Sequence, residues 1–273
     1  MRKSGSHPLP RVGNDVVDLA HPACQGRSPG DRLLSRILSE KEHTWLDAGT
    51  DALWPVRLWA LWAAKEAAFK VGAKSEGASV FAPGTLECSL TIEAPPGGFT
   101  PAGGKASAGV HIEGTVLGPG RGGEVRVEGT SDGNFLHVVG WSPAEESPPP
   151  GFFEVGVETM PEGDAEEALD SFRGRFSEVE WQGVHSIPSA RVRLLVRERL
   201  RTAIAPGGAP GGEDPADQSI EILTSRDRPG RTPPRIRIAG EDRPDLDVSL
   251  SHHGRYLAWA LLFPLRTPGE TER

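Results

Sequence analysis

The hydrophobic pattern that is easiest to assign lies in the first half of the chain. Residues Trp62–Lys70 (WAAKEAAFK) are rich in alanine, contain neither glycine nor proline, and carry long side chains at helical spacing, which predicts a helix within Ala52–Lys74. Trp62, Glu66 and Lys70 are four residues apart and therefore share one face of a mostly apolar helix. Glu66 and Lys70 are either a solvated pair worth a few tenths of a kcal/mol, or charged groups that a metal ion and a phosphate would partner.

A strand is predicted near the start of the chain, over Arg11–Leu19, because this segment is rich in valine. Asp15 stands among these valines, although aspartate is disfavoured inside strands. It therefore either caps the strand end and the following turn, or serves a chemical purpose. Two short helices are expected next, over Asp31–Leu38 and Glu40–Leu46, with Ser39 as the N-cap of the second.

The rest of the pattern consists of short β-type runs around a second helix. That helix, Ser189–Ala205, is amphipathic and sets a row of arginines against an apolar face. Strands combined with few helices in this way indicate an α+β protein. The predicted strands are Leu86–Ile92, Gly109–Leu117, Glu124–Val127, Asn134–Trp141, Phe152–Met160, Ile220–Leu223, Arg235–Ile238, Leu246–Leu250 and Tyr256–Phe263.

The two halves of the chain resemble each other. Val155–Glu158 (VGVE) echoes Val12–Asp15 (VGND), and Gly254–Leu257 (GRYL) echoes Gly133–Leu136 (GNFL). Each half runs strand, helix and several strands. The shared order indicates a duplicated α+β unit.

Glycine and proline (34 and 25 residues) gather in a few stretches that we interpret as surface loops and one central linker. The linker contains the proline run 148–150, so we expect a first half at residues 1–147 and a second half at residues 148–273. No glycine run follows a strand and opens a helix with Lys-Ser/Thr, so the sequence contains no P-loop.

Composition excludes several classes of function. The chain has 273 residues, of which 37% are hydrophobic and 25% charged, as is ordinary for a soluble protein. Its net charge of −8 argues against general nucleic-acid binding. The cysteines, Cys24 and Cys88, fit neither a disulfide framework nor a zinc site and indicate a reducing cytoplasm. No apolar run approaches the ~20 residues of a membrane span, and the N-terminus lacks the apolar region of a signal peptide, so we expect a cytoplasmic protein without membrane contact.

A third stretch with chemical potential is Ser249–Gly254 (SLSHHG), at the junction of an apolar strand and a turn. One interpretation is a hydroxyl and an imidazole directed at an anion. A tight turn with exposed histidines is the plainer alternative. A His-His metal site is a third, although no further histidine or cysteine lies at ligand spacing.

Together these stretches resemble the motifs of the 4′-phosphopantetheinyl transferases, which are Gly-x-Asp-(Ile/Val), (Trp/Phe)-x-x-Lys-Glu-Ala-x-x-Lys and Ser-x-Ser-His-x-Gly. They stand here as Gly13–Val16, Trp62–Lys70 and Ser249–Gly254. The order of the motifs, and the segment Arg36–Ser39 followed by Glu42, resemble the small holo-acyl-carrier-protein synthases. The length and the internal echo resemble the larger pseudo-dimeric enzymes. The resemblance implies two similar α+β halves related by pseudo-twofold symmetry, with the active site at the interface between them.

The resemblance also implies roles for individual residues. Asp15 and Glu66 would bind Mg²⁺. Glu66 and Lys70 would be catalytic, and Lys70 would also contact a phosphate. Further contacts to coenzyme A are expected from Ser251, His252, Lys65, Arg36, Arg193 and Arg231.

One departure from the family pattern bears on the metal. The larger enzymes carry a second carboxylate two residues after the motif aspartate, where this chain has Val17, and the nearest acid is Asp18. We therefore expect a two-carboxylate Mg²⁺ site completed by phosphate oxygens and water, since magnesium usually keeps several waters. Replacement of Val17 by Glu is expected to leave activity intact or to improve it.

The activity that the resemblance implies is transfer of phosphopantetheine from coenzyme A to a serine of an acyl or peptidyl carrier protein. Such a transferase would serve fatty acid, polyketide or nonribosomal peptide biosynthesis and would act as a monomer. Two alternatives stay open: a non-catalytic module of the same fold that binds coenzyme A or a carrier protein, and a Mg²⁺-dependent phosphohydrolase.

Overall fold

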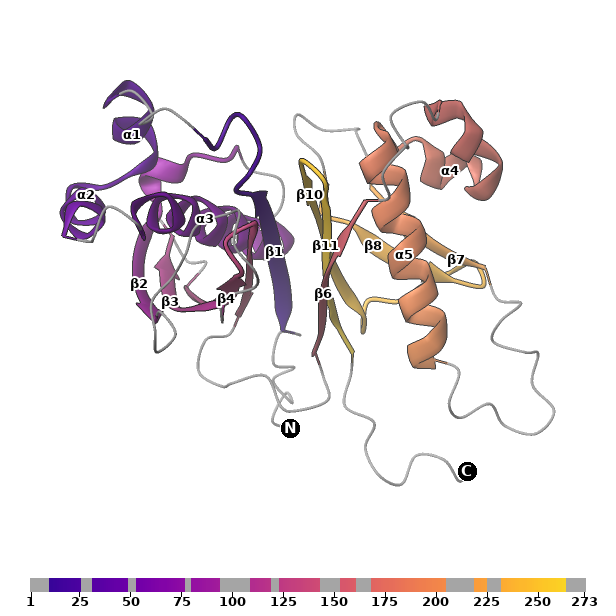
Figure 1. Cartoon of the computed structure of the whole chain (residues 1–273). Helices are drawn as coiled ribbons and strands as arrows, with labels where there is room; N and C mark the ends of the chain where they lie inside the picture. The colour runs from indigo at the N-terminus through magenta and orange to yellow at the C-terminus, as the bar shows by residue number, and fades with distance from the viewer. Residues whose placement is uncertain are drawn as a thin grey trace, which may run out of the picture.

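The chain folds as a mixed α+β protein, as the pattern predicted (Figure 1). The structure is a computed structural model that describes residues 10–25, 31–48, 53–76, 80–93, 109–118, 123–142, 153–160, 168–204, 219–224 and 232–263. Two sheet-and-helix bodies lie side by side, with β1 at the border of one and β6, β10 and β11 at the border of the other. The expected boundary near residue 147 lies outside the described residues.

The first half is built on a five-stranded antiparallel sheet of order β1-β5-β4-β3-β2. Strand β1 pairs with β5 from Arg11↔Ser142 to Asp18↔Phe135, so β1 is the edge strand of this sheet. The elements are β1 (Arg11–Asp18), α1 (Asp31–Ile37), α2 (Glu40–Asp47), α3 (Trp54–Glu76), the short 3₁₀ helix η2 (Pro83–Thr85), β2 (Glu87–Glu93), β3 (Val110–Leu117), β4 (Glu124–Ser131) and β5 (Phe135–Ser142).

Helix α3 packs across this sheet and lies close to β1. The expected helix is confirmed, and Pro55 lies in its first turn, where a missing amide costs no hydrogen bond. Gly13 of β1 allows the close approach, because a Cβ there would lie 2.0 Å from the carbonyl oxygen of Ala67. Ser39 caps α2 as predicted, and the Glu42 side chain accepts from the Ser39 amide in return.

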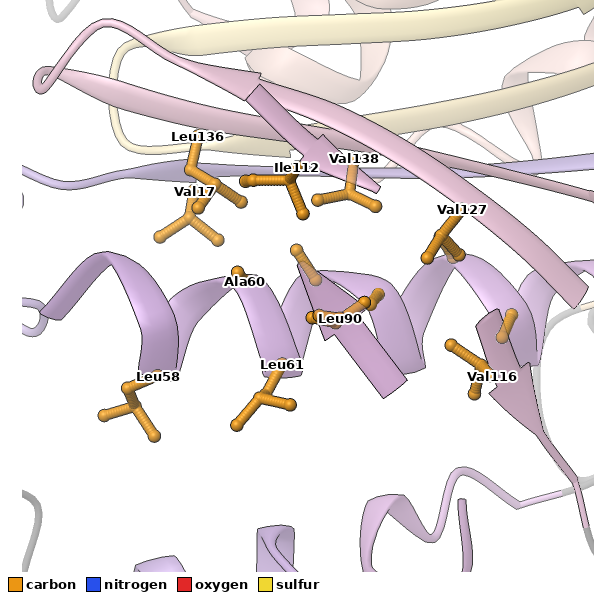
Figure 2. Close-up of a cluster of buried hydrophobic side chains, with 14 of the residues drawn as sticks. Val17, Leu58, Ala60, Leu61, Leu90, Ile112, Val116, Val127, Leu136 and Val138 are labelled. Atoms are coloured by element: carbon orange, nitrogen blue, oxygen red, sulfur yellow. The ribbon is translucent and has the colours of Figure 1, made fainter. Parts of the chain in front are cut away.

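Apolar side chains surround α3 on more than one side. Figure 2 shows Val17, Leu136, Ile112 and Val138 between the helix and the sheet, with Leu58 and Leu61 on the opposite side of the helix. The small alanines of the helix let these layers approach, so burial of both sides stabilises α3 more than its intrinsic propensity does.

Val17 belongs to this core, which changes the expectation for its replacement. Val17 is 3% exposed and packs with the hydrophobic cluster beneath α3. A carboxylate at this position has no described cation beside it, so we expect Val17→Glu to destabilise the fold by at least about 3 kcal/mol instead of improving activity. Urea unfolding of Val17→Glu against Val17→Ile, which stays apolar, measures the difference. Equal stabilities would contradict the placement of Val17.

The second half carries two three-stranded sheets, β10-β11-β6 and β7-β8-β9. Helix α5 packs Val196 and Leu200 against Trp259 and Leu261 of β11. The elements are β6 (Phe153–Thr159), the 3₁₀ helix η4 (Leu169–Arg175), α4 (Glu178–Trp181), α5 (Ile187–Ile204), β7 (Ile220–Leu223), β8 (Arg235–Ile238), β9 (Glu241–Asp242), β10 (Asp247–His253) and β11 (Tyr256–Leu262).

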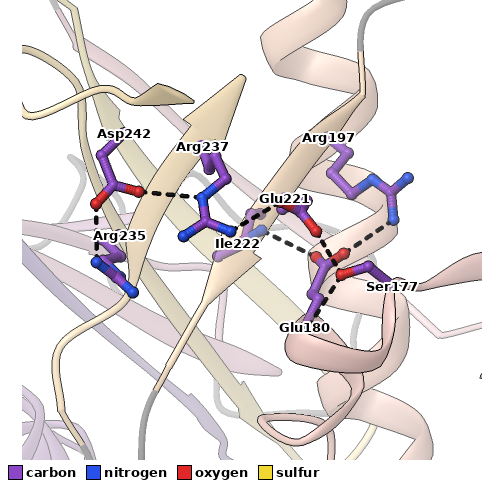
Figure 3. A network of polar contacts seen from close by, with 8 residues as sticks. All are labelled: Ser177, Glu180, Arg197, Glu221, Ile222, Arg235, Arg237 and Asp242. Atoms are coloured by element: carbon purple, nitrogen blue, oxygen red, sulfur yellow. Dashed lines mark hydrogen bonds and ion pairs between the residues drawn. The ribbon is translucent and has the colours of Figure 1, made fainter. Parts of the chain in front are cut away.

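The arginines of α5 are engaged within the second half. Buried Glu180 accepts from Arg197 and from the backbone amide of Ile222, which ties α4 to α5 and β7 (Figure 3). Arg199 lies over the indole of Trp259 and pairs with Glu158. Several arginines of the basic face therefore make contacts within the second half.

The bodies meet through the faces of β1 and β5 on one side and of β6 and β11 on the other. Val12 and Val139 pack with Ala260 and Leu262, and the rings of Phe135 and Tyr256 lie 5.1 Å apart. The short sequence echoes fall on these same strands and on the turns that lead into β5 and β11. Among the described residues, no helix is long and apolar enough to cross a membrane.

Candidate functional site at the border of the two halves

The ammonium group of Lys70 lies at the centre of a cluster of charged side chains. Its Nζ is 3.2 Å from Oδ1 of Asp15 and 3.3 Å from Oε2 of Glu66, and it donates to the backbone oxygen of Asn14 at 2.7 Å. Asp15 comes from β1, and Glu66 and Lys70 come from one face of α3, as the four-residue spacing predicted. Glu66 and Lys70 are each 26% exposed in their side chains, so the cluster is accessible from one side.

The second half contributes a hydroxyl to this cluster. Ser251 of β10 donates to Oδ1 of Asp15 at 2.7 Å and accepts from the backbone amide of Val16 at 3.1 Å. The structure thus brings together Asp15, Glu66, Lys70 and Ser251, which lie up to 236 positions apart in the sequence.

The electrostatics of the cluster favour an additional cation. Burial, opposed by the charge of Lys70 and assisted by that of Glu66, raises the pKa of Asp15 to about 6. Burial alone would lower the pKa of Lys70, but Asp15 and Glu66 more than offset this and hold it above its ordinary value. Two carboxylates therefore share one ammonium in a low-dielectric site.

The donors fit the magnesium ion that the resemblance implies. Among the described residues, no three His, Cys, Asp or Glu side chains gather into a metal-binding group. The protein would therefore supply only two ligands, the carboxylates of Asp15 and Glu66. This suits Mg²⁺, which commonly keeps waters and phosphate oxygens at its other positions. Asp18 does not join them, because its carboxylate accepts from the Ala20 amide and from the backbone and guanidinium of Arg255.

A cavity of about 270 Å³ adjoins the cluster. Phe69, Lys70 and Lys74 of α3 line it from the first half, and residues of α5 and β10 line it from the second. His252 is one of these, with its ring centroid 5.9 Å from that of His185. Apolar walls with a few cationic and hydroxyl groups suit a ligand that is partly apolar and partly anionic.

The other expected coenzyme A ligands are placed differently. Arg193 lines the cavity, but its guanidinium donates to Ser189, to the Gly183 carbonyl and to Thr224, so it mainly braces the cavity wall. Arg36 is exposed in the last turn of α1. Arg231 lies outside the described residues.

Lys65 corrects the expectation that it contacts coenzyme A. It is 0% exposed, and its ammonium donates to the Ile37 carbonyl, to Glu42 and to the Pro83 carbonyl. The physical reason is its position on α3: it faces α1, α2 and η2, whereas Glu66 and Lys70 face β1. All of its donor capacity is used inside the protein.

Two features of the site were not inferred from the sequence. Lys74 lies one turn after Lys70 on the same face, a spacing that could have indicated it, and it binds Asp247. Asn14 hydrogen-bonds through Nδ2 to Nε2 of the buried His137 at 3.2 Å. Nothing in the sequence around His137 indicates this contact, because it depends on the pairing of β1 with β5.

The burial of His137 predicts how stability depends on pH. Burial and, to a smaller extent, the charge of Lys70 together lower the pKa of His137 to about 4. Between about pH 6.5 and about pH 4 the unfolded chain binds a proton at His137 that the native protein does not bind. The free energy of unfolding therefore decreases by up to about 3 kcal/mol as the pH is lowered through this range. The raised pKa of Asp15 acts in the opposite direction, since native Asp15 binds a proton below about pH 6 that the unfolded chain does not.

Single variants separate the two effects. We expect His137→Gln, which keeps an acceptor for Asn14, to lose less stability than the parent protein between pH 7 and pH 4.5, and Asp15→Asn to lose more. Urea unfolding in metal-free buffer at both pH values measures this. Identical pH dependence in all three proteins would contradict the two pKa shifts.

Comparison with known proteins bears on the first half of this site. Residues 11–90 match the family model described as the 4′-phosphopantetheinyl transferase superfamily. The matched segment contains Asp15, Glu66 and Lys70 but ends before Ser251. No curated protein matches the chain. The match over residues 11–90 agrees with the resemblance to the 4′-phosphopantetheinyl transferase superfamily, a family of transferases, that the motifs Gly13–Val16 and Trp62–Lys70 indicated.

Proposed function

We propose that this protein transfers phosphopantetheine from coenzyme A to a serine of an acyl or peptidyl carrier protein and that it requires Mg²⁺. The observation that carries the proposal is the contact of Ser251 with Asp15, which joins the carboxylates of the matched segment to the Ser-His stretch of the second half. The adjoining cavity of about 270 Å³ offers room for part of coenzyme A.

The proposed reaction breaks the phosphoanhydride bond of coenzyme A and forms a phosphate ester bond to the carrier serine. The serine oxygen of the carrier attacks the phosphorus that bears the pantetheine group, and the bond from that phosphorus to the bridging oxygen breaks. The bridging oxygen leaves with 3′,5′-ADP, and the serine proton passes to Glu66, directly or through a water. The difficult part of this exchange is the negative charge that gathers on the leaving diphosphate oxygen.

Each residue of the cluster has a task in this scheme. Asp15 and Glu66 would hold Mg²⁺, which when bound would neutralise the diphosphate. Lys70 would donate to a phosphate oxygen, and its raised pKa keeps it charged at neutral pH. Ser251 orients Asp15, and His252 faces the cavity from the second half, where it would contact the diphosphate or the ribose phosphate of coenzyme A.

The proposal includes the architecture implied by the resemblance. We infer a duplication in which residues 1–147 and 148–273 form two related halves, with pseudo-twofold symmetry and the active site between them. The equivalent positions of the echoes on β1, β6, β5 and β11 support this, as does the packing of α3 and α5 on their respective sheets. A duplicated chain of this kind supplies both sides of the site and would act as a monomer.

The test is a transfer assay followed by mass spectrometry. Purified protein is incubated with coenzyme A, Mg²⁺ and a panel of apo acyl and peptidyl carrier proteins, and each carrier is examined for the mass of one added phosphopantetheine. We expect a gain on at least one carrier, lost when EDTA replaces Mg²⁺. Coenzyme A binding without a gain on any carrier would contradict the transferase and favour a non-catalytic binding module.

A further inference from the structure

Strand β1 lies beside β10 without pairing to it through the backbone. Its other edge is paired with β5, so its remaining amides need acceptors. Four side chains on alternate residues of β10 accept from four alternate amides of β1. The contacts join Val12 to Asp247 (2.8 Å), Asn14 to Ser249 (2.9 Å), Val16 to Ser251 (3.1 Å) and Asp18 to Nδ1 of His253 (2.9 Å).

These four contacts form a ladder with a constant separation of 235 positions, so β1 and β10 run in the same direction. The ladder alone does not select one register. Each of its four side chains can accept an amide hydrogen, and a shift by two residues would still leave three contacts. Ser249 and Ser251 are chemically equivalent in such a shift, so another interaction has to distinguish them.

Lys74 supplies that distinction at the buried Val12 end of the strand, and the more exposed Arg255–Asp18 ion pair lies at the other end. Its ammonium donates to the backbone oxygen of Val12 at 2.6 Å, to Oδ2 of Asp247 at 2.9 Å and to the backbone oxygen of Val248 at 2.7 Å. The side chains of Lys74 and Asp247 are 4% and 7% exposed. In a shifted register the ammonium would be buried beside a different residue of β10 and would lose its carboxylate, which is strongly unfavourable.

The consequence reaches the candidate site. Ser251 lies four residues beyond Asp247 on β10, and Asp15 lies three residues beyond Val12 on β1, so the position of the first contact decides which residue meets Asp15. We propose that the Lys74–Asp247 ion pair fixes the register of β10 on β1 and thereby places the Ser251 hydroxyl on the Asp15 carboxylate. Lys74 and Asp247 are thus positioning residues. The register itself does not depend on the proposed function; the importance of the Ser251–Asp15 contact for phosphopantetheine transfer does.

Amide hydrogen exchange tests the register without coenzyme A or a carrier protein, so its result is independent of whether the protein is a transferase. The variant is Lys74→Met/Asp247→Asn, which buries no lone charge and keeps an acceptor for the Val12 amide. If the ion pair fixes the register, the protection factors of the Val12, Val16 and Asp18 amides fall at least tenfold. This fall is measured relative to the amide of Val138 in β5, which serves as the reference. Asp18 lies about 20 Å from Val12 along the strand, so a local effect does not reach it.

Two further variants complete the test. Ser249→Ala removes one contact and leaves the ion pair, so its loss of protection should be confined to Asn14. If the double variant does not fold, Lys74→Met alone, which leaves Asp247 beside Arg11, is measured and should give the same pattern along β1. A loss confined to Val12, or unchanged protection at Val16 and Asp18, would overturn the proposal, because the ion pair would then hold only its own end of the strand.

Discussion

Glu66→Ala should reduce phosphopantetheine transfer by at least about a hundredfold while leaving the protein folded. Glu66 is placed both as a metal ligand and as the base for the carrier serine, and loss of a general base alone typically costs 10²–10⁴-fold. Its side chain is 26% exposed and, among the described residues, pairs with Lys70, so the fold does not depend on it. The rate is measured from the appearance of modified carrier by mass spectrometry.

The matched control for Glu66 is Glu93→Ala, which removes an exposed carboxylate at the end of β2. It should transfer at the parental rate. Glu66→Gln keeps the shape of the side chain and removes its charge, so it should be as inactive as the alanine variant. If the Glu66→Ala protein is active, Glu66 is neither a metal ligand nor the base for the carrier serine. The proposed magnesium site would then lack its second carboxylate beside Asp15.

Lys65→Met should destabilise the fold by about 3–5 kcal/mol, the usual cost of leaving one member of a buried ion pair alone. Lys65 is 0% and Glu42 2% exposed, and the ammonium of Lys65 lies 2.7 Å from Oε2 of Glu42. Two backbone carbonyls, of Ile37 and Pro83, lose a donor in the same variant. Urea unfolding measures the loss.

Two comparisons separate this structural role of Lys65 from a role in binding. Lys65→Met/Glu42→Gln removes both charges and should be more stable than Lys65→Met alone. Lys41→Met breaks an exposed pair with Glu87 and should leave stability nearly unchanged. A Lys65→Met protein with parental stability and weakened coenzyme A binding would restore the interpretation of Lys65 as a ligand.

The helix, the first strand and the last hairpin could be predicted from the sequence because each has a local signal. Alanine content and four-residue spacing predicted α3 and the shared face of Glu66 and Lys70, and Asp15 stood out as a carboxylate among valines. These signals do not depend on tertiary contacts. They also sufficed to point to the superfamily, which the match over residues 11–90 supports.

The environment of Lys65 could not be predicted, because α3 is apolar around most of its circumference. Helical spacing shows which residues share a face, but it does not show which face meets β1 and which meets α1 and α2. The same limit applies to Arg193, two of whose partners, Gly183 and Thr224, lie in loops outside its own helix. Val17 was judged by its distance along the chain from Asp15, whereas its burial under α3 is a tertiary property.

The side-chain ladder between β1 and β10 was also beyond the sequence. Asp247, Ser249, Ser251 and His253 alternate along the strand, but alternation alone does not reveal which strand edge they will meet. The interaction depends on β1 being the edge strand of the first sheet, and this follows only from the full strand order.

A crystal structure of the protein with coenzyme A and Mg²⁺ would show whether the two halves share one site. We expect one metal ion bound to Asp15, to Glu66 and to the diphosphate, with His252 in contact with the same coenzyme A molecule. Coenzyme A bound at a site that touches only one of the two halves, or a diphosphate distant from both carboxylates, would contradict this expectation.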